Sequence, residues 1–172
     1  KEAGYQVDFI PEDTEAFMKR LTAQATNDRS MLTEEQEAAC QKVPKKLYCD
    51  LFATFPEETR RQMEKDWGKA PGRVMTTESG DILVPGLMDG HIFLTVQAPR
   101  GYGFDASKIY HDPFIAPTHQ YLAYYQWIRD VWGADAVVHV GTHGNLEWLP
   151  GKSAGMDRGS YPDLALGSLP NI

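Results

Sequence analysis

The sequence predicts an α/β fold in which buried strands are flanked by helices and the N-terminal portion is helical. The first 70 residues are rich in Glu, Lys, Arg and Gln, and their apolar residues recur at helical spacing. From residue 71 onward, short apolar runs alternate with loops that contain glycine and proline. A helix predicted over residues 119–132 precedes an apolar run over 136–140 and a glycine loop, an order that is typical of α/β proteins.

The composition fits two connected segments, a helical segment over residues 1–70 and an α/β segment over 71–172, which we do not expect to be independent domains. With 42% hydrophobic and 24% charged residues, the 172-residue chain can form a hydrophobic core. The chain begins without a methionine and ends without a closing element, so we expect a fragment of a much larger multi-domain subunit.

Four helices are predicted in the first segment. Thr14 can cap the first, and Thr33 with Gln36 has the form of a capping box that opens the second. The third covers residues 45–55, and the fourth covers 56–68, where a proline can occupy the first turn and a glycine ends the helix.

Two apolar runs are predicted to be buried strands, at residues 91–97 and 136–140. The loops 98–103 and 141–144 follow them. We expect these strands to be parallel neighbours in one sheet. Their following loops then meet at the same edge, where ligands gather in α/β proteins.

Charge and composition exclude several classes of protein. The net charge of −7, from 17 basic and 24 acidic residues, argues against a nucleic-acid-binding surface. No apolar run reaches the roughly 18 residues of a membrane span, and no signal-like N-terminus is visible. Cys40 and Cys49 form no CxxC pair, which fits a reducing compartment, so we expect a cytoplasmic protein.

The segment 138–152 reads VHVGTHGNLEWLPGK and carries the strongest candidate site. His139, His143 and Glu147 are spaced by four, but the glycines between them disfavour one continuous helix. We expect His139 to end a strand, His143 to lie on the loop, and Glu147 to lie in the first turn of a short helix that Asn145 caps. The three side chains can still converge on one point.

Imidazole and carboxylate groups together suit a divalent first-row metal, and both also accept protons near neutral pH. Glu147 can therefore be a metal ligand or a general base, and the sequence leaves both open. His111, on a predicted loop, is a further candidate ligand, whereas His119 opens a helix and is expected at the surface.

Gly151, Lys152 and Ser153 resemble the end of a phosphate loop, but Leu146 stands where the motif requires a glycine. We therefore expect no ATP binding by this chain. Lys152 and Arg100 are better interpreted as partners for substrate carboxylates.

The stretches VQAPRGYG, IYHDPFIAPTHQYLAYYQWIRDVWGADAVVHVGTHGNLEWLPGKSAG and SYPDLALGSLPNI resemble the large subunit of cobaltochelatase and, more distantly, that of magnesium chelatase. The resemblance covers about residues 45–172. It implies a very large subunit that binds a tetrapyrrole and inserts a metal, an enzyme that forms nitrogen–metal bonds. It also implies separate AAA+ type partner subunits that hydrolyse ATP.

The resemblance further implies that Glu147, His143 and His139 line the active-site pocket, with Arg100 on its rim. The APRG and LEWLPGK motifs resemble the cobalt branch, which implies cobalt insertion into a corrin precursor in cobalamin biosynthesis. The divalent metal is then a substrate, with magnesium or iron as alternatives to cobalt. Aromatic residues such as Tyr110 and Trp148 can stack against the macrocycle.

Three other interpretations stay open. The chain can belong to a paralogue that acts on another tetrapyrrole, including one that removes a metal. It can also be part of a zinc-dependent hydrolase with His139, His143 and Glu147 as ligands. The third is a tetrapyrrole-binding module without catalysis.

Overall fold

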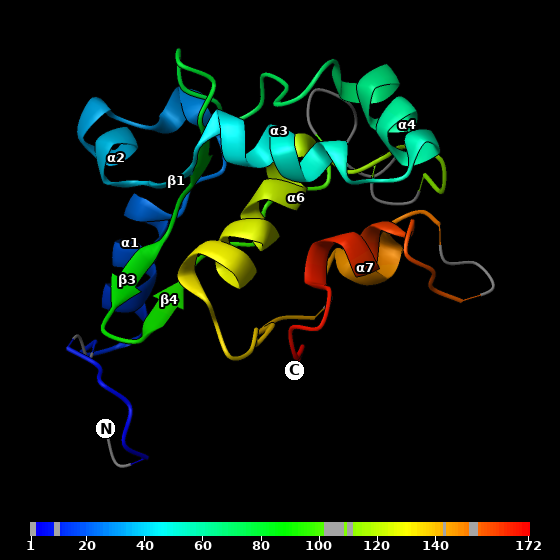
Figure 1. The fold of residues 1–172 in the computed structure, drawn as a ribbon. Helices are drawn as coiled ribbons and strands as arrows, with labels where there is room; N and C mark the ends of the chain where they lie inside the picture. Colours follow the sequence, from blue (N-terminus) through cyan, green and yellow to red (C-terminus); the bar gives the residue numbers. More distant parts are fainter. Residues whose placement is uncertain (1–2, 9–10, 102–108, 110–111, 143, 152–154) are drawn as a thin grey trace.

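A computed structural model describes residues 3–8, 11–101, 109, 112–142, 144–151 and 155–172 of the chain. As the α/β class predicts, the chain mixes helices with short strands (Figure 1). The helical elements are α1 (Thr14–Gln24), η1 (Arg29–Met31), α2 (Glu34–Ala39), α3 (Lys45–Ala53), α4 (Glu57–Trp67), α6 (His119–Gln126), the π-helix η2 (Trp127–Trp132), the 3-10 turn η3 (Leu146–Trp148) and α7 (Tyr161–Leu166). The strands are β1 (Gln41–Val43), β2 (Ile82–Val84), β3 (Leu87–Asp89) and β4 (Ile92–Leu94).

The four N-terminal helices lie where the sequence predicts them. Thr33 and Gln36 form the expected capping box of α2, and Gly68 ends α4 with a φ of 82° that favours glycine. One cap was wrong. Asp13 caps α1, because its carboxylate accepts a hydrogen bond from the backbone N–H of Ala16 at 2.8 Å, and Thr14 is the first helical residue.

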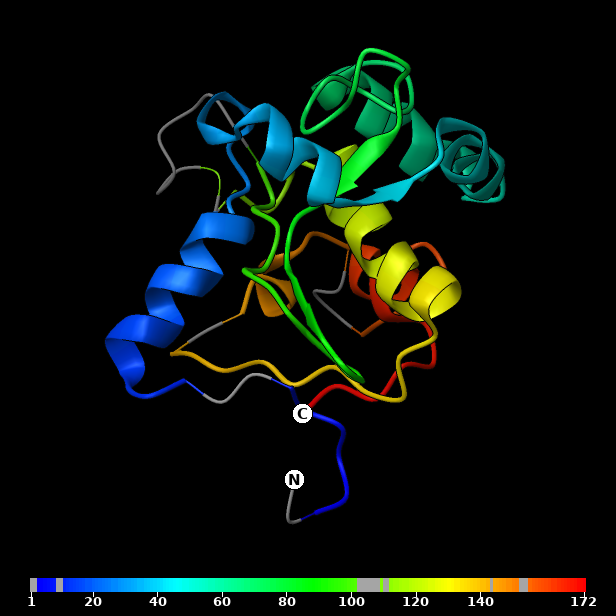
Figure 2. The same cartoon turned by 90° about the vertical axis from the view of Figure 1, so that its left-hand side faces the viewer.

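The strands pair differently from the prediction of parallel neighbours. In the described residues they form two separate antiparallel pairs, β1 with β2 and β3 with β4. Figure 2 shows the β3–β4 hairpin in the middle of the view with α6 to its right, and Phe93 packs on Trp127 with ring centroids 4.8 Å apart. The β1–β2 pair joins residues from both sides of position 70, and a boundary there stays a prediction.

The strand predicted over residues 91–97 is shorter than expected. β4 ends at Leu94, opposite Leu87, the first residue of β3. Pro85, two residues before β3, has no backbone N–H with which to extend the ladder. The side chain of Thr95 instead donates to the backbone oxygen of Pro85 at 2.7 Å. The chain then runs on without regular structure through Gln97 to Arg100.

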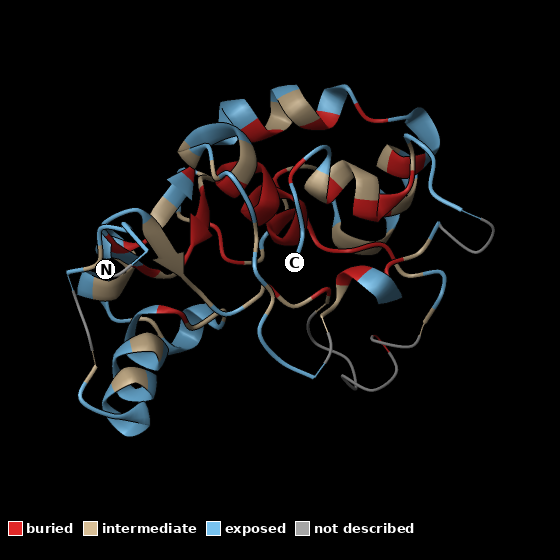
Figure 3. Cartoon of the chain, turned by 90° about the horizontal axis from the view of Figure 1, so that it is seen from below, coloured by how far each residue is buried: buried red, intermediate tan, exposed pale blue. Residues whose placement is uncertain are grey.

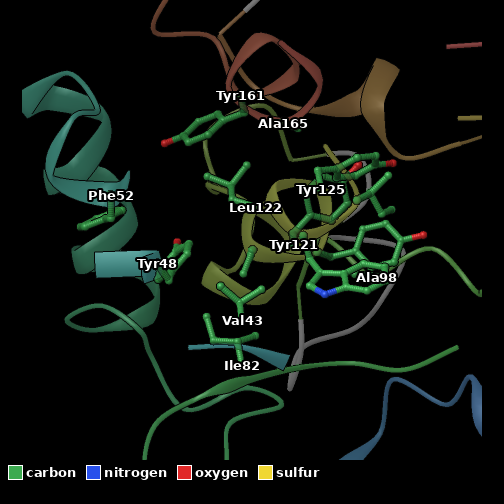
Figure 4. Packing of buried hydrophobic residues seen from close by; sticks show 14 of the residues in the cluster. Val43, Tyr48, Phe52, Ile82, Ala98, Tyr121, Leu122, Tyr125, Tyr161 and Ala165 are labelled. Atoms are coloured by element: carbon green, nitrogen blue, oxygen red, sulfur yellow. The ribbon is translucent and has the colours of Figure 1, made fainter. Parts of the chain in front are cut away.

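Helix α6 forms the centre of the core, and every one of its eight residues is buried (Figure 3). Thr118 caps it by accepting from the N–H of Tyr121, and Gly133, at a φ of 74°, closes the π-helical continuation. Around it pack Tyr48 and Phe52 of α3 and Tyr161 of α7 (Figure 4). No helix within the described ranges is long and apolar enough to cross a bilayer.

His119, expected at the surface, is buried at the start of α6. Its Nε2 donates to the backbone oxygen of Gly68 at 2.9 Å, so its Nδ1 accepts from the hydroxyl of Tyr48 at 2.8 Å. Burial lowers the pKa of His119, although its bond to Gly68 acts in the opposite direction. This histidine therefore joins α3, α4 and α6 rather than serving a ligand.

Candidate functional site

The backbone of His139 is held by the C-terminal segment of the chain. Val137 donates to the oxygen of Pro170 at 2.8 Å, and His139 donates to the oxygen of Ile172 at 2.8 Å. The prediction of a buried strand over 136–140 was wrong. The segment is extended (Figure 2) but forms one isolated parallel bridge, between Val137 and Asn171.

Exposure alternates along this extended segment. Val138 and Val140 are 62% and 95% exposed, whereas Val137 and His139 are half-buried. Alternation with a period of two is expected of an extended backbone with one covered face. The imidazole of His139 therefore lies on the covered face.

On that face, the ring of His139 meets Tyr125 of α6. The Tyr125 hydroxyl lies 3.0 Å from Nε2 of His139, and the two rings pack edge to face with centroids 6.4 Å apart. Tyr125 has no solvent-exposed surface, so the contact fixes the histidine ring against the core.

Gln97, which follows β4, contacts both halves of the candidate site. Its Oε1 accepts from the backbone N–H of Asn145 at 2.9 Å. Its Nε2 donates to the hydroxyls of Tyr125 at 2.6 Å and Tyr121 at 3.3 Å. Sequence reasoning did not identify Gln97, Tyr121 or Tyr125 as site residues. In the structure, Gln97 and Tyr125 contact the candidate segment directly, and Tyr121 contacts Gln97.

The Tyr125 hydroxyl stays neutral over the physiological range. Its pKa is raised to about 12, mainly by burial and to a smaller extent by the negative charge of Glu147, against the lowering effect of hydrogen bonds from Gln97 and Tyr121. The carboxylate of Glu147 is therefore close enough to the Tyr125 hydroxyl to act on its pKa.

Glu147 lies in the 3-10 turn η3, with an exposed side chain. Its neighbours Leu146 and Leu149 are 6% and 2% exposed and anchor the turn to the core. As predicted, Glu147 lies in the first turn of a short helix, and Asn145 occupies its N-cap position. The expected cap bond was wrong, because the Asn145 side chain accepts no hydrogen bond from the helix.

Gly144 brings Glu147 and Gln97 close together. A Cβ at this glycine would lie 3.4 Å from Oε2 of Glu147 and 3.9 Å from Nε2 of Gln97. The carboxylate therefore lies near the Gln97 amide that contacts Tyr125, and through Tyr125 near His139.

Arg100 does not lie on the rim of a pocket, as was predicted. Its side chain is 0% exposed, and its guanidinium donates to the backbone oxygens of Trp148 at 2.5 Å, Asp112 at 2.7 Å and Ile115 at 2.9 Å. Through its bond to Trp148, Arg100 supports the turn that carries Glu147 from the interior of the protein. It cannot reach a substrate carboxylate in this arrangement.

The remaining candidates divide into two groups. Trp148 lies beside Glu147 and is 44% exposed. His143, His111, Tyr110 and Lys152 lie outside the described residues. Among described side chains, no group of three His, Cys, Asp or Glu residues is placed to hold a metal ion.

A separate cleft of about 560 Å³ lies between α3, η2 and α7. Leu51, Phe55 and Leu164 make its lining largely apolar, with Arg129 and Arg158 at its edge. None of the candidate residues that the structure describes lines this cleft.

Comparison with known proteins assigns the family. The family model described as CobN/Magnesium Chelatase matches residues 1–172. The chain is 39% identical over 172 residues to the aerobic cobaltochelatase subunit CobN of Pseudomonas aeruginosa, covering 100% of this chain and 14% of the relative. It is 31% identical over 174 residues to the chloroplastic magnesium-chelatase subunit ChlH of Oryza sativa subsp. indica, covering 100% of this chain and 12% of that protein.

Comparison with solved structures points to the same family. The catalytic subunit of cobaltochelatase from Mycobacterium tuberculosis matches 99% of this chain with a TM-score of 0.84 and 39% identity, over 15% of its own length. The chain thus spans about a seventh of the relatives that it matches. Because the family model matches every residue of the sequence, the chain belongs to the CobN/magnesium chelatase family.

Proposed function

We propose that the chain is part of the tetrapyrrole-binding, metal-inserting subunit of an ATP-dependent chelatase, and that it inserts cobalt into a corrin precursor. The observation that carries the proposal is the exposed carboxylate of Glu147 on a turn whose backbone is held by Gln97 and Arg100. An accessible acid on a rigid support is what proton transfer to or from a bound macrocycle requires.

The reaction needs a base near the substrate. A free-base tetrapyrrole loses two pyrrole protons when a metal enters, and a carboxylate that accepts one contributes roughly 10²–10⁴-fold to the rate. Glu147 is exposed and suits this role, and Trp148 beside it offers a partly exposed ring for stacking on the macrocycle.

The metal is a substrate here. We propose that Glu147 and His143 help to replace its water ligands one at a time, with His111 as a further donor. His139 has a different position, because its Nε2 already contacts Tyr125. We therefore assign His139 a supporting part in the pocket rather than the leading role of a ligand.

The choice of cobalt follows from the APRG and LEWLPGK motifs, which resemble the cobalt branch. Relatives named for cobalt and for magnesium both align with the whole chain, so the metal is the finer part of the proposal. We further propose a cytoplasmic complex in which AAA+ type partner subunits hydrolyse ATP, since this chain lacks a phosphate loop.

The test is metal transfer by the full-length protein with its partner subunits, comparing wild type with Glu147→Gln. Zinc content of the purified protein and the tetrapyrrole that quenches its tryptophans provide the second measurement. A tightly held zinc ion without tetrapyrrole binding would favour the hydrolase alternative.

A further inference from the structure

We infer that Gln97 is a positioning residue of the chelatase site, which sets the place of Glu147 through the backbone of Asn145 and the orientation of His139 through Tyr125. The inference rests on the proposed function, since it concerns how that site is held. Gln97 touches no reacting atom itself.

The first step is the support of the turn η3 at both of its ends. At the start, the N–H of Asn145 donates to Oε1 of Gln97, and at the end, the oxygen of Trp148 accepts from Arg100. Gln97 and Arg100 belong to the same short segment after β4. One segment therefore fixes both ends of the three residues that carry Glu147.

The second step is the orientation of the Gln97 amide. A backbone N–H can only donate, so the atom of Gln97 that faces Asn145 must be the carbonyl oxygen. The amide nitrogen then faces the two tyrosines and donates one hydrogen to each hydroxyl. Its contacts with Asn145 and the tyrosines thus remove the ambiguity between amide oxygen and nitrogen.

The third step is the contact that links Tyr125 to His139. The Tyr125 oxygen accepts from Gln97 and hydrogen bonds with Tyr121, and both bonds lower the Tyr125 pKa, as bonds donated to a phenol oxygen do. The Tyr125 oxygen also lies 3.0 Å from Nε2 of His139, so the chain of hydrogen bonds runs from Gln97 through Tyr125 to the imidazole.

The imidazole of His139 is therefore held at Nε2 by the hydroxyl that Gln97 contacts. Its Nε2 is occupied by Tyr125 and is not presented to a metal. Gln97 thus acts on the orientation of His139 through a single intervening hydroxyl, that of Tyr125.

The experiment uses the full-length protein with its partner subunits and measures kcat for metal transfer and the Kd of the tetrapyrrole separately. Gln97→Met keeps the length of the side chain but removes both hydrogen-bonding groups. We expect kcat to fall on the order of 10²-fold, as for a displaced catalytic group, with little change in tetrapyrrole Kd.

Gln126→Met is the matched control. Gln126 is 3% exposed and adjacent to Tyr125, and within the described residues it has no hydrogen bond to His139 or to the turn that carries Glu147. We expect wild-type kcat from this variant. An equal loss of kcat in both variants, or wild-type kcat in Gln97→Met, overturns the inference.

A double-mutant cycle separates positioning from general structural support. If Gln97 acts through Glu147, Gln97→Met costs much less in a Glu147→Asp background, where the carboxylate is already displaced. If Gln97→Met lowers kcat by the same factor in the Glu147→Asp background as in wild type, the inference is overturned. Should Gln97→Met fail to fold, Gln97→Glu tests the contact with Tyr125 alone, because it keeps the acceptor for Asn145 and removes the donor to Tyr125. Wild-type kcat in that variant overturns the role of Gln97 in orienting His139.

The two proposals fail in different ways. Normal metal transfer by Glu147→Gln refutes the proposed function whatever Gln97 does. An inactive Glu147→Gln protein together with a fully active Gln97→Met protein refutes only the positioning role.

Discussion

The guanidinium of Arg100 donates a hydrogen bond to the backbone oxygen of Trp148 at 2.5 Å, from a position without solvent exposure. It also donates to the backbone oxygens of Asp112 and Ile115. One buried side chain therefore joins the segment before α6 to the turn that carries Glu147. The position of Glu147 depends on this arginine as well as on Gln97.

Replacing Arg100 by lysine is expected to lower the free energy of unfolding by about 2 kcal/mol or more. An ammonium group cannot reproduce the fork that serves three carbonyls, and each buried acceptor left without its donor costs about 1–3 kcal/mol. Urea denaturation of the chain measures this loss. The control is Arg73→Lys at an exposed position, where we expect a change within about 0.5 kcal/mol. Equal stability of the two variants would contradict the supporting role of Arg100.

His119 is expected to make stability depend on pH. Because burial lowers its pKa in the folded chain, the unfolded chain, with a histidine pKa of about 6.5, binds more protons in the acid range. Its contribution to stability is thus fully present above about pH 6.5 and is lost as the pH falls towards the folded pKa.

The variant His119→Gln tests this expectation. Glutamine offers a donor to Gly68 and an acceptor to Tyr48 but does not titrate. Between about pH 7.5 and pH 5.5, wild type should lose more unfolding free energy than the variant. Parallel pH profiles in urea denaturation would show that His119 does not cause the dependence.

The chain is expected not to bind ATP. Leu146 replaces the glycine of the phosphate-loop motif, and it is the first residue of η3, with a side chain that is 6% exposed. Isothermal titration calorimetry should give no saturable heat with ATP and magnesium. Saturation in the micromolar range would require a nucleotide site of another kind.

Local signals in the sequence predicted the helices well. The capping box of Thr33 and Gln36 and the glycine at position 68 involve residues a few positions apart, so their geometry follows from the chain itself. Strand pairing depends on distant partners. The valines of the 136–140 run suggested a buried strand, yet its described partner is the segment near Asn171, and two of the valines are exposed.

Only some residues of the candidate site could likewise be predicted from the sequence. His139 and Glu147 could be found from residue type, because imidazole and carboxylate groups carry recognisable chemistry. Gln97 could not, because an amide at the end of an apolar run has no signature. Its role depends on a hydrogen bond to Asn145, 48 positions away in the sequence. Tyr125 was hidden for a related reason, since a tyrosine in a buried helix looks like core packing.

The most direct test of the account is the rate of metal transfer by full-length Glu147→Gln, measured beside its tetrapyrrole affinity. The amide keeps the size of the side chain but cannot accept a proton, so we expect metal transfer to be abolished and the tetrapyrrole Kd to stay within a few-fold of wild type. Metal transfer at the wild-type rate in this variant would contradict the account and remove Glu147 from the mechanism.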